Sequence, residues 1–270
     1  MARSSSHLEW ARKWRQWIDY LGPEGDWCRQ EELDPAMIKL LGSVHGKKVL
    51  DAGCGEGRFC RLLAEHGARA VGVDIVPAFV ELATAVSLGR CTAQTTRRWP
   101  WLGQHKECWA RKTQYVVADI SRLPRSLNGC FDAVLSCCSL NHVADLQKAV
   151  RCIRRVLKGE GICVACLPNP YHVRPFGRTL AQATDGARAF REAVSPTLRI
   201  TNIYRTFATV VNTFSDCGMY LDRVEEPLIG TTAAHRWAND IREIRSVRGL
   251  PNPSRLPWFV VLRFRKQNRG

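Results

Sequence analysis

The sequence lacks the long apolar run that a membrane-spanning helix needs. No stretch of 18 or more apolar residues occurs in the 270 residues, which excludes a membrane span. The first seven residues contain no apolar signal core, so we expect a cytoplasmic protein. With 20 Gly and 13 Pro the chain is too poor in both for a fibrous protein, and 45% hydrophobic residues are too many for a disordered one.

Twelve cysteines are present, but their positions argue against a secreted disulfide scaffold. Cys137, Cys138, Cys163 and Cys166 lie in apolar runs that predict buried strands, where a free thiol acts as a small hydrophobic group. Cys163 and Cys166 form a C-x-x-C pair, yet residues three apart on a strand face opposite ways, and no second pair supplies further ligands. We therefore expect reduced thiols and no metal site.

The chain is basic, because 40 Lys and Arg face 25 Asp and Glu and leave a net charge of +15. Basic residues concentrate at 90–112, 174–205 and 236–269, although no run of five like charges occurs. Such a charge is compatible with RNA binding, but net charge alone governs association and solubility rather than a specific function.

Hydrophobic spacing predicts an α/β fold. Two amphipathic helices, at 8–21 and 35–41, come first and are separated by a break at 22–26. From residue 47 short apolar runs alternate with amphipathic segments, which is typical of a doubly wound, mostly parallel sheet with helices on both faces. We predict seven strands, at 49–52, 70–74, 115–119, 131–136, 161–167, 220–225 and 258–264. The intervening helices are predicted at 59–66, 77–87, 146–157 and 206–217.

Two segments exceed this pattern and suggest the domain organisation. Residues 1–45 are predicted to form an N-terminal helical lid, and residues 46–270 the main domain, with insertions at about 88–113 and 171–200. The first insertion carries Trp99, Trp101 and Trp109, which either stack on an aromatic substrate or base or pack against a helix. The second is predicted to be a helical cap over the carboxyl edge of the sheet.

A glycine-rich loop follows the first predicted strand, where parallel sheets bind ligands. The loop Gly53–Gly57 has its third glycine one residue early for the dinucleotide pattern G-x-G-x-x-G. Asp51 and Glu56 beside it would each repel a pyrophosphate by roughly 1 kcal/mol, which argues against a dehydrogenase. The same carboxylates would attract a ligand that carries an ammonium and a sulfonium.

Acidic residues also end the next two predicted strands. Asp74 lies 21 residues after Gly53, a distance at which a carboxylate accepts hydrogen bonds from ribose hydroxyls. Asp119 is placed to accept from an adenine amino group. The alternative is that such residues are helix caps, with Asp119 capping the turn at Ser121.

The segment 49–59, with the sequence VLDAGCGEGRF, resembles the first motif of class I S-adenosylmethionine-dependent methyltransferases. Residues 71–74, 117–120, 131–145 and 157–161 resemble later motifs of the same family in the same order. The resemblance extends over about residues 47–167, and residues 24–26 and 33–36 look like a subgroup that methylates small molecules. It implies a Rossmann-like methyltransferase fold with S-adenosylmethionine as cofactor, S-adenosylhomocysteine as product and no metal.

The resemblance also implies roles for individual residues. Gly53 and Gly55 are expected to pack against the methionine part of the cofactor, and Asp51 to face its ammonium or to order the loop. Cys54 is expected at the cofactor site, and Arg29 either pairs with the cofactor's carboxylate or forms an ordinary surface salt bridge. The residues expected around the cofactor's ribose and adenine are Asp74, Ile75, Asp119 and Ile120. Ser136 and Cys137 are expected to offer backbone groups to it.

A catalytic base is the least determined element. His142 follows the fourth strand and is our candidate to take a proton from the acceptor; the alternative is a histidine bonded to backbone. Tyr20, His172 and Tyr204 are further candidates for this base, because they lie in segments expected to fold over the pocket. The sequence after the fourth strand is SCCS, not the Asn/Asp-Pro-Pro-Tyr of base N-methylating relatives.

These observations favour a methyltransferase that moves a methyl group to oxygen or nitrogen of a small-molecule acceptor by in-line displacement. One alternative is a tRNA or rRNA methyltransferase that uses the basic, Trp-containing insertion. Another is a methyltransferase-like partner subunit without catalysis. The sequence leaves the acceptor and the oligomeric state open.

Overall fold

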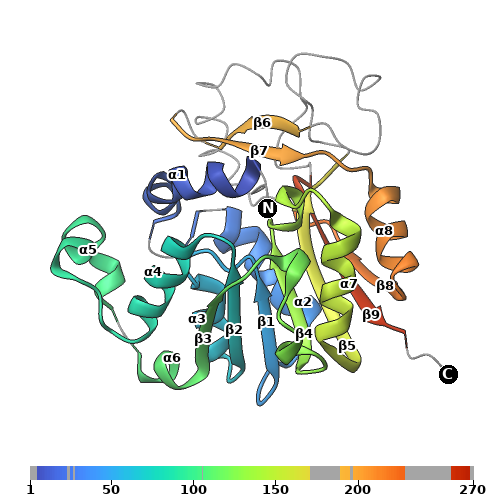
Figure 1. The fold of residues 1–270 in the computed structure, drawn as a ribbon, viewed down its shortest axis with the longest axis horizontal. Helices are drawn as coiled ribbons and strands as arrows, with labels where there is room; N and C mark the ends of the chain where they lie inside the picture. The colour runs from blue at the N-terminus through green and yellow to red at the C-terminus, as the bar shows by residue number, and fades with distance from the viewer. Residues whose placement is uncertain are drawn as a thin grey trace.

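The structure is a computed structural model that describes residues 5–22, 25–26, 28–104, 106–170, 189–194, 197–228 and 257–267. A seven-stranded sheet forms its centre, in the order β3-β2-β1-β4-β5-β9-β8 (Figure 1). β9 is the one strand of this sheet that runs antiparallel to its neighbours, so the expected mostly parallel, Rossmann-like sheet is confirmed. The strands are β1 (Lys48–Ala52), β2 (Arg69–Asp74), β3 (Thr113–Val117), β4 (Phe131–Cys137), β5 (Leu157–Pro168), β8 (Met219–Glu225) and β9 (Phe259–Lys266).

Each face of the sheet buries a separate hydrophobic cluster beneath helices. On one face, α7 (Leu146–Val156) and α8 (Phe207–Asp216) cover alternate strand residues such as Leu50 and Val134. On the other, α2 (Asp34–Leu41) and α3 (Arg58–Glu65) cover the residues between them, such as Val49 and Ala133. This alternation is what a strand with both faces buried requires. Among the described helices, none has the length and apolarity to cross a membrane.

The first insertion packs beside the sheet. It folds into α5 (Ala93–Arg98), a 3₁₀ turn and α6 (Glu107–Lys112). Trp99 and Trp109 are buried in a third cluster with residues of α1 (Ser5–Leu21) and α4 (Pro77–Ser87). The indole N–H groups of both rings donate to carboxylates, Asp19 and Glu65. Of the two predicted roles for these tryptophans, packing against helices is therefore the one observed for Trp99 and Trp109.

The described end of the second insertion is a β-hairpin. β6 (Ala189–Ala193) pairs antiparallel with β7 (Arg199–Ile203), and this pair lies with α1 above the carboxyl edge of the sheet (Figure 1). The predicted helical cap over 171–200 is thus wrong for 189–193, because strand pairing between distant segments decided what periodicity within the segment did not. Residues 171–188, including His172, lie outside the described part of the chain.

Several boundaries differ from those predicted, among them the start of β5, at Leu157 rather than residue 161. β3 ends at Val117 rather than at Asp119, and because it is an edge strand, Val117 is 50% exposed. The helix α2 is preceded by a π-helical turn, η1 (Arg29–Leu33), and begins at Asp34 rather than at Pro35. The Asp34 carboxylate accepts two hydrogen bonds from the Arg58 guanidinium, at 2.6 and 2.8 Å, and so joins α2 to α3.

Candidate functional site

The glycine loop after β1 is held by backbone hydrogen bonds to β2. The N–H groups of Gly53 and Cys54 both donate to the Val73 carbonyl, at 2.8 and 3.0 Å. Gly53 has a φ of 87°, and a Cβ built there would lie 2.3 Å from the Ser139 hydroxyl, so only glycine fits. Gly55 has a φ of 53°, and a Cβ there would meet nothing within 4 Å. The loop is therefore tightly packed below and open above Gly55.

Two buried carboxylates flank the loop. Asp51, at the end of β1, is 2% exposed and accepts a hydrogen bond from the Cys60 thiol at 3.5 Å. Burial raises its pKa to about 8. Asp74, at the end of β2, accepts hydrogen bonds from the N–H groups of Gly55 and Val76, at 3.0 and 2.9 Å, and burial raises its pKa to about 6. Both groups would gain from a ligand that donates hydrogen bonds or carries positive charge.

Asp119 follows β3 and caps the short turn η3 (Ile120–Arg122). Its Oδ1 accepts from both the N–H and the hydroxyl of Ser121, at 2.8 and 2.7 Å. The capping role weighed at the sequence level is thus present, and the adenine role stays a prediction. Ile120 is 7% exposed and its side chain reaches within 3.6 Å of the Cβ position of Gly53. Ile75 is half-buried beside the α1–α4 cluster.

The end of β4 lies against the same loop. The Ser136 hydroxyl is fully buried and donates to the Ala52 carbonyl at 3.1 Å. The Ser139 hydroxyl lies within hydrogen-bond distance of the carbonyls of Gly53, at 3.2 Å, and of Cys137, at 3.1 Å. Both serines join β4 to the β1 edge, so the backbone of Cys137 lies close to the loop, as the prediction for it requires.

Arg29 and Tyr20 meet at Asp26, close to the end of β4. The Arg29 guanidinium pairs with the Asp26 carboxylate at 2.5 Å, and both side chains are largely buried. The Tyr20 hydroxyl also hydrogen-bonds Asp26, and burial raises the pKa of this phenol well above its ordinary value. Arg29 interacts electrostatically with Cys137 and Cys138, so its ion pair is an internal one near the loop rather than an exposed surface pair.

Both ring nitrogens of His142 have partners. Nδ1 lies 2.8 Å from the Thr201 carbonyl, which only accepts, so Nδ1 carries the proton. Nε2 then accepts from the Asn141 amide at 3.2 Å. Burial lowers the pKa of this imidazole to about 4, and the Trp10 ring packs edge-on against it with centroids 5.1 Å apart. This geometry is that of a neutral histidine joining η5 (Leu140–His142), β7 and α1; its role as a base stays a prediction.

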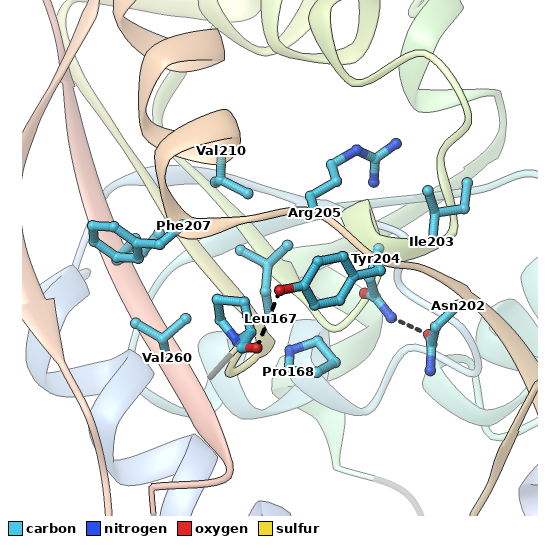
Figure 2. Close-up of a pocket in the computed structure, with 12 residues that line it drawn as sticks. Leu167, Pro168, Asn202, Ile203, Tyr204, Arg205, Phe207, Val210 and Val260 are labelled. Atoms are coloured by element: carbon cyan, nitrogen blue, oxygen red, sulfur yellow. Dashed lines mark hydrogen bonds between the residues drawn. The ribbon is translucent and has the colours of Figure 1, made fainter. Parts of the chain in front are cut away.

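A second hollow opens on the other side of β4, beyond the carboxyl end of β5 (Figure 2). Its lining is mostly apolar, and the roughly 450 Å³ of empty space at it includes the open solvent at its mouth. The Tyr204 hydroxyl points to the turn after β5 and donates to the Pro170 carbonyl at 3.4 Å. The apolar lining residues are Leu167, Pro168, Pro170, Ile203, Phe207, Val210, Val260 and Leu262.

One polar atom at this pocket has no partner among the described residues. Asn141 is 5% exposed, and its amide donates to Asn202 at 2.5 Å. Its carbonyl oxygen, Oδ1, is buried without a hydrogen bond within the described ranges. An unsatisfied buried acceptor is costly, so this oxygen would gain from a group that donates a hydrogen bond to it.

Sequence reasoning missed three of these residues. Asn141 and Ser139 were seen only as part of the segment after β4, and nothing local distinguishes them. Arg58 was recognised as part of the first motif, but its ion pair with Asp34, which lies 24 residues earlier in the chain, was not predicted. Pairing across such distances is decided by packing, so no local signal could have found it.

The residues at the loop fit S-adenosylmethionine. Open space above Gly55 leaves room for a ligand against the backbone, and the buried carboxylates of Asp51 and Asp74 suit an ammonium and ribose hydroxyls. Asp51 and the loop lie at the end of β1, next to β4 at the centre of the sheet, where ligands bind in this architecture.

Comparison with known proteins agrees with this arrangement. Residues 50–165 match a family model described as a methyltransferase domain. The chain is 26% identical over 150 residues to a ubiquinone biosynthesis O-methyltransferase of Idiomarina loihiensis, covering 54% of this chain and 53% of the relative. It is 31% identical over 145 residues to a demethylmenaquinone methyltransferase of Tropheryma whipplei, covering 53% and 52%. The chain thus spans about half the length of these relatives.

A solved structure shares the fold over most of the chain. It is an S-adenosylmethionine-dependent methyltransferase from Mesorhizobium loti, with a TM-score of 0.58 and 21% identity. The match covers 91% of this chain and all of that one. At this identity the likeness is one of fold.

Proposed function

We propose that residues 50–165, which match a methyltransferase domain model, form a class I S-adenosylmethionine-dependent methyltransferase domain, and on this basis we propose the reaction of the chain. It transfers a methyl group to an oxygen of a small molecule that has an apolar body and a hydrogen-bond donor. The buried, unpartnered Oδ1 of Asn141 at an apolar pocket beside β4 is the observation that carries the acceptor class. Two relatives are named a ubiquinone biosynthesis O-methyltransferase and a demethylmenaquinone methyltransferase, and these names support an acceptor of this type.

The arrangement suits two ligands that meet at the end of β4. The proposed cofactor loop follows β1 on one side of β4, and the pocket lies beyond β5 on the other. When bound, S-adenosylmethionine supplies an electrophilic methyl group on a sulfonium. Methyl transfer is an in-line displacement, so the protein mainly aligns the acceptor and excludes water.

The side chains of the pocket divide this work. The apolar residues bury the body of the acceptor, and Asn141 Oδ1 accepts a hydrogen bond from its hydroxyl, which orients the oxygen. The amide cannot take the hydroxyl proton, which leaves to solvent at the open mouth of the pocket. Arg205 donates to the carbonyls of Leu140, Val143 and Ala144, which holds the turn that carries Asn141. His142 stays neutral at physiological pH because burial lowers its pKa to about 4.

The RNA alternative has lost part of its basis. That hypothesis expects the Trp rings of the insertion to stack on RNA bases. Trp99 and Trp109 are only 4% and 9% exposed, so these two rings are not available for stacking. The charge of +15 remains its support. Nucleic-acid binding through charge weakens steeply with salt, so filter binding of tRNA at low and physiological salt separates the two proposals.

Calorimetric titration of S-adenosylhomocysteine into the wild type and Asp74→Ala tests the cofactor site. We expect micromolar binding by the wild type and a loss of roughly 1–3 kcal/mol on removal of the charged hydrogen-bond partner. Glu81→Ala, on the adjacent helix α4 and exposed, is a matched control that should bind like the wild type. No binding by the wild type would contradict the proposal.

A second titration addresses the acceptor. In the presence of S-adenosylhomocysteine, apolar phenols and hydroquinones should bind, and Asn141→Leu should weaken phenol binding more than binding of the corresponding methyl ether. A polar acceptor such as an amino acid should not bind. Equal loss for the phenol and its ether would show that Asn141 shapes the pocket without receiving the hydroxyl.

A further inference from the structure

Three thiols converge at the carboxyl ends of β4 and β5. The Sγ atoms of Cys137, Cys138 and Cys166 all lie within 4.8 Å of one another. Those of Cys138 and Cys166 are 3.8 Å apart. Cys137 ends β4, Cys138 follows it, and Cys166 lies on the neighbouring strand β5. Cys138 and Cys166 are 28 positions apart along the chain. No role in the proposed methyl transfer requires their side chains.

The backbone brings the third thiol to the other two. Cys137 and Cys166 are register partners on parallel strands, so their side chains leave the sheet on the same face. The next residue of an extended strand would face the opposite way. Cys138 instead has a φ of 51°, the one positive φ outside glycine among the described residues, and its N–H donates to the Cys166 carbonyl at 3.0 Å. A non-glycine residue in this conformation is strained, and such strain gathers at functional sites.

Positive charge lies beside the cluster. The Arg29 guanidinium interacts electrostatically with Cys137 and Cys138, and the Arg58 guanidinium with Cys137. A guanidinium favours the thiolate form of a neighbouring cysteine, which is the form that binds a metal.

We propose that Cys137, Cys138 and Cys166 form a three-thiolate binding site for a thiophilic divalent cation of the Zn²⁺ type. Sulfur atoms bound to zinc at about 2.3 Å lie about 3.8 Å apart in a tetrahedron, which is the separation of Cys138 and Cys166. A disulfide between Cys138 and Cys166 would not explain why the Cys137 thiol also lies beside them. Three protein ligands leave the fourth position to an external ligand, as catalytic zinc sites do.

The site adjoins the proposed cofactor loop. Ser139, the residue after Cys138, hydrogen-bonds the carbonyls of Cys137 and Gly53. One of the three proposed ligands, Cys138, is therefore the residue directly before Ser139, which makes the contact between the end of β4 and the loop. The proposal concerns the thiols alone and stands independently of the methyl acceptor.

The test uses two titrations of the reduced, metal-free protein. In the first, Cd²⁺ is added and its binding is monitored by the thiolate-to-metal charge-transfer absorption. In the second, Zn²⁺ is added in competition with a chromogenic chelator. We expect one ion per chain in the wild type. Cys138→Gly and Cys166→Ala should bind at least about 100-fold more weakly, since removal even of an outer partner costs 10- to 100-fold. Cys138→Gly is the decisive variant because glycine accepts the positive φ and the fold is retained.

Cys163→Ala is the matched control. It lies on β5 three residues before Cys166 and is equally buried, but on the opposite face of the sheet. Its affinity should equal that of the wild type. Retention of the charge-transfer band in Cys138→Gly would overturn the proposal. So would a reduced wild type that binds no Zn²⁺ and forms a Cys138–Cys166 disulfide on oxidation.

Discussion

The Ser139 hydroxyl lies 3.2 Å from the Gly53 carbonyl oxygen, and a Cβ on Gly53 would lie 2.3 Å from that hydroxyl. The two residues are 86 positions apart in the chain. One belongs to the loop after β1 and the other follows β4, so this contact sets how closely the two strand ends approach. The proposed cofactor site depends on that approach.

Gly53→Ala should therefore both unfold more easily and lose the cofactor. The added methyl group overlaps Ser139 and forces a φ of 87° on a residue that disfavours it, which should cost at least about 2 kcal/mol of unfolding free energy. Urea unfolding measures the stability and calorimetry the affinity for S-adenosylhomocysteine. The double variant Gly53→Ala/Ser139→Gly should recover part of both losses; no recovery would mean that the clash is not with Ser139.

Gly55→Ala should separate binding from stability. A Cβ at Gly55 meets nothing, and the same holds for Gly129, whose φ is 62° against 53° at Gly55. Each substitution should cost about 1 kcal/mol of stability. Only Gly55→Ala should weaken S-adenosylhomocysteine, because its methyl group projects into the space proposed for the ligand. Equal affinities of the two variants would place the ligand elsewhere.

Cofactor affinity should depend on pH through Asp74. Burial raises the pKa of this carboxyl to about 6, and the ribose hydroxyls bind its ionised form. The part of the affinity for S-adenosylhomocysteine that depends on Asp74 should thus be lost as the pH drops through 6, below the range in which Asp51, with a pKa of about 8, titrates. Calorimetry between about pH 5 and 8, a range that brackets the pKa of about 6, checks this. Asp74→Asn should bind more weakly and without this pH dependence.

Glu32 should make the folded state less stable at neutral pH than at acidic pH. It is 2% exposed, its Oε1 has no partner within the described ranges, and burial raises its pKa to about 7. Because the folded pKa lies above the ordinary 4.5, the folded state holds the proton more tightly. Stability is therefore lost as the pH rises between these two values, by roughly 2–3 kcal/mol.

Glu32→Gln removes this dependence and keeps the shape of the side chain. Urea unfolding at about pH 5 and 8 should show a smaller difference between the two pH values for Glu32→Gln than for the wild type. Glu31→Gln is the matched control, since Glu31 is the exposed neighbour. A wild-type difference that persists in Glu32→Gln would assign it to other buried carboxyls.

The order of strands and helices was predictable because its signals are local. Alternating apolar runs and a glycine loop followed by a helix act within a few residues of one another. They predicted the parallel sheet and the positions of Asp51 and Asp74 at its carboxyl edge, with errors at the edge strand β3. There Val117 is half exposed, so apolar character marks the strand end poorly.

The amino-acid sequence by itself determined the sheet, the loop at Gly53 and the family resemblance, since each follows from spacing along the chain. Only the tertiary structure decided which distant groups meet. The β6–β7 hairpin, the partners of His142 and the unpartnered Asn141 at its pocket all arise from contacts between segments far apart in sequence. The contact between Cys138 and Cys166 could not be predicted from the sequence either. The C-x-x-C spacing pairs Cys166 with Cys163, whereas the positive φ of Cys138 brings its thiol to within 3.8 Å of Cys166. Such contacts depend on the packing of whole elements, which no short stretch of sequence records.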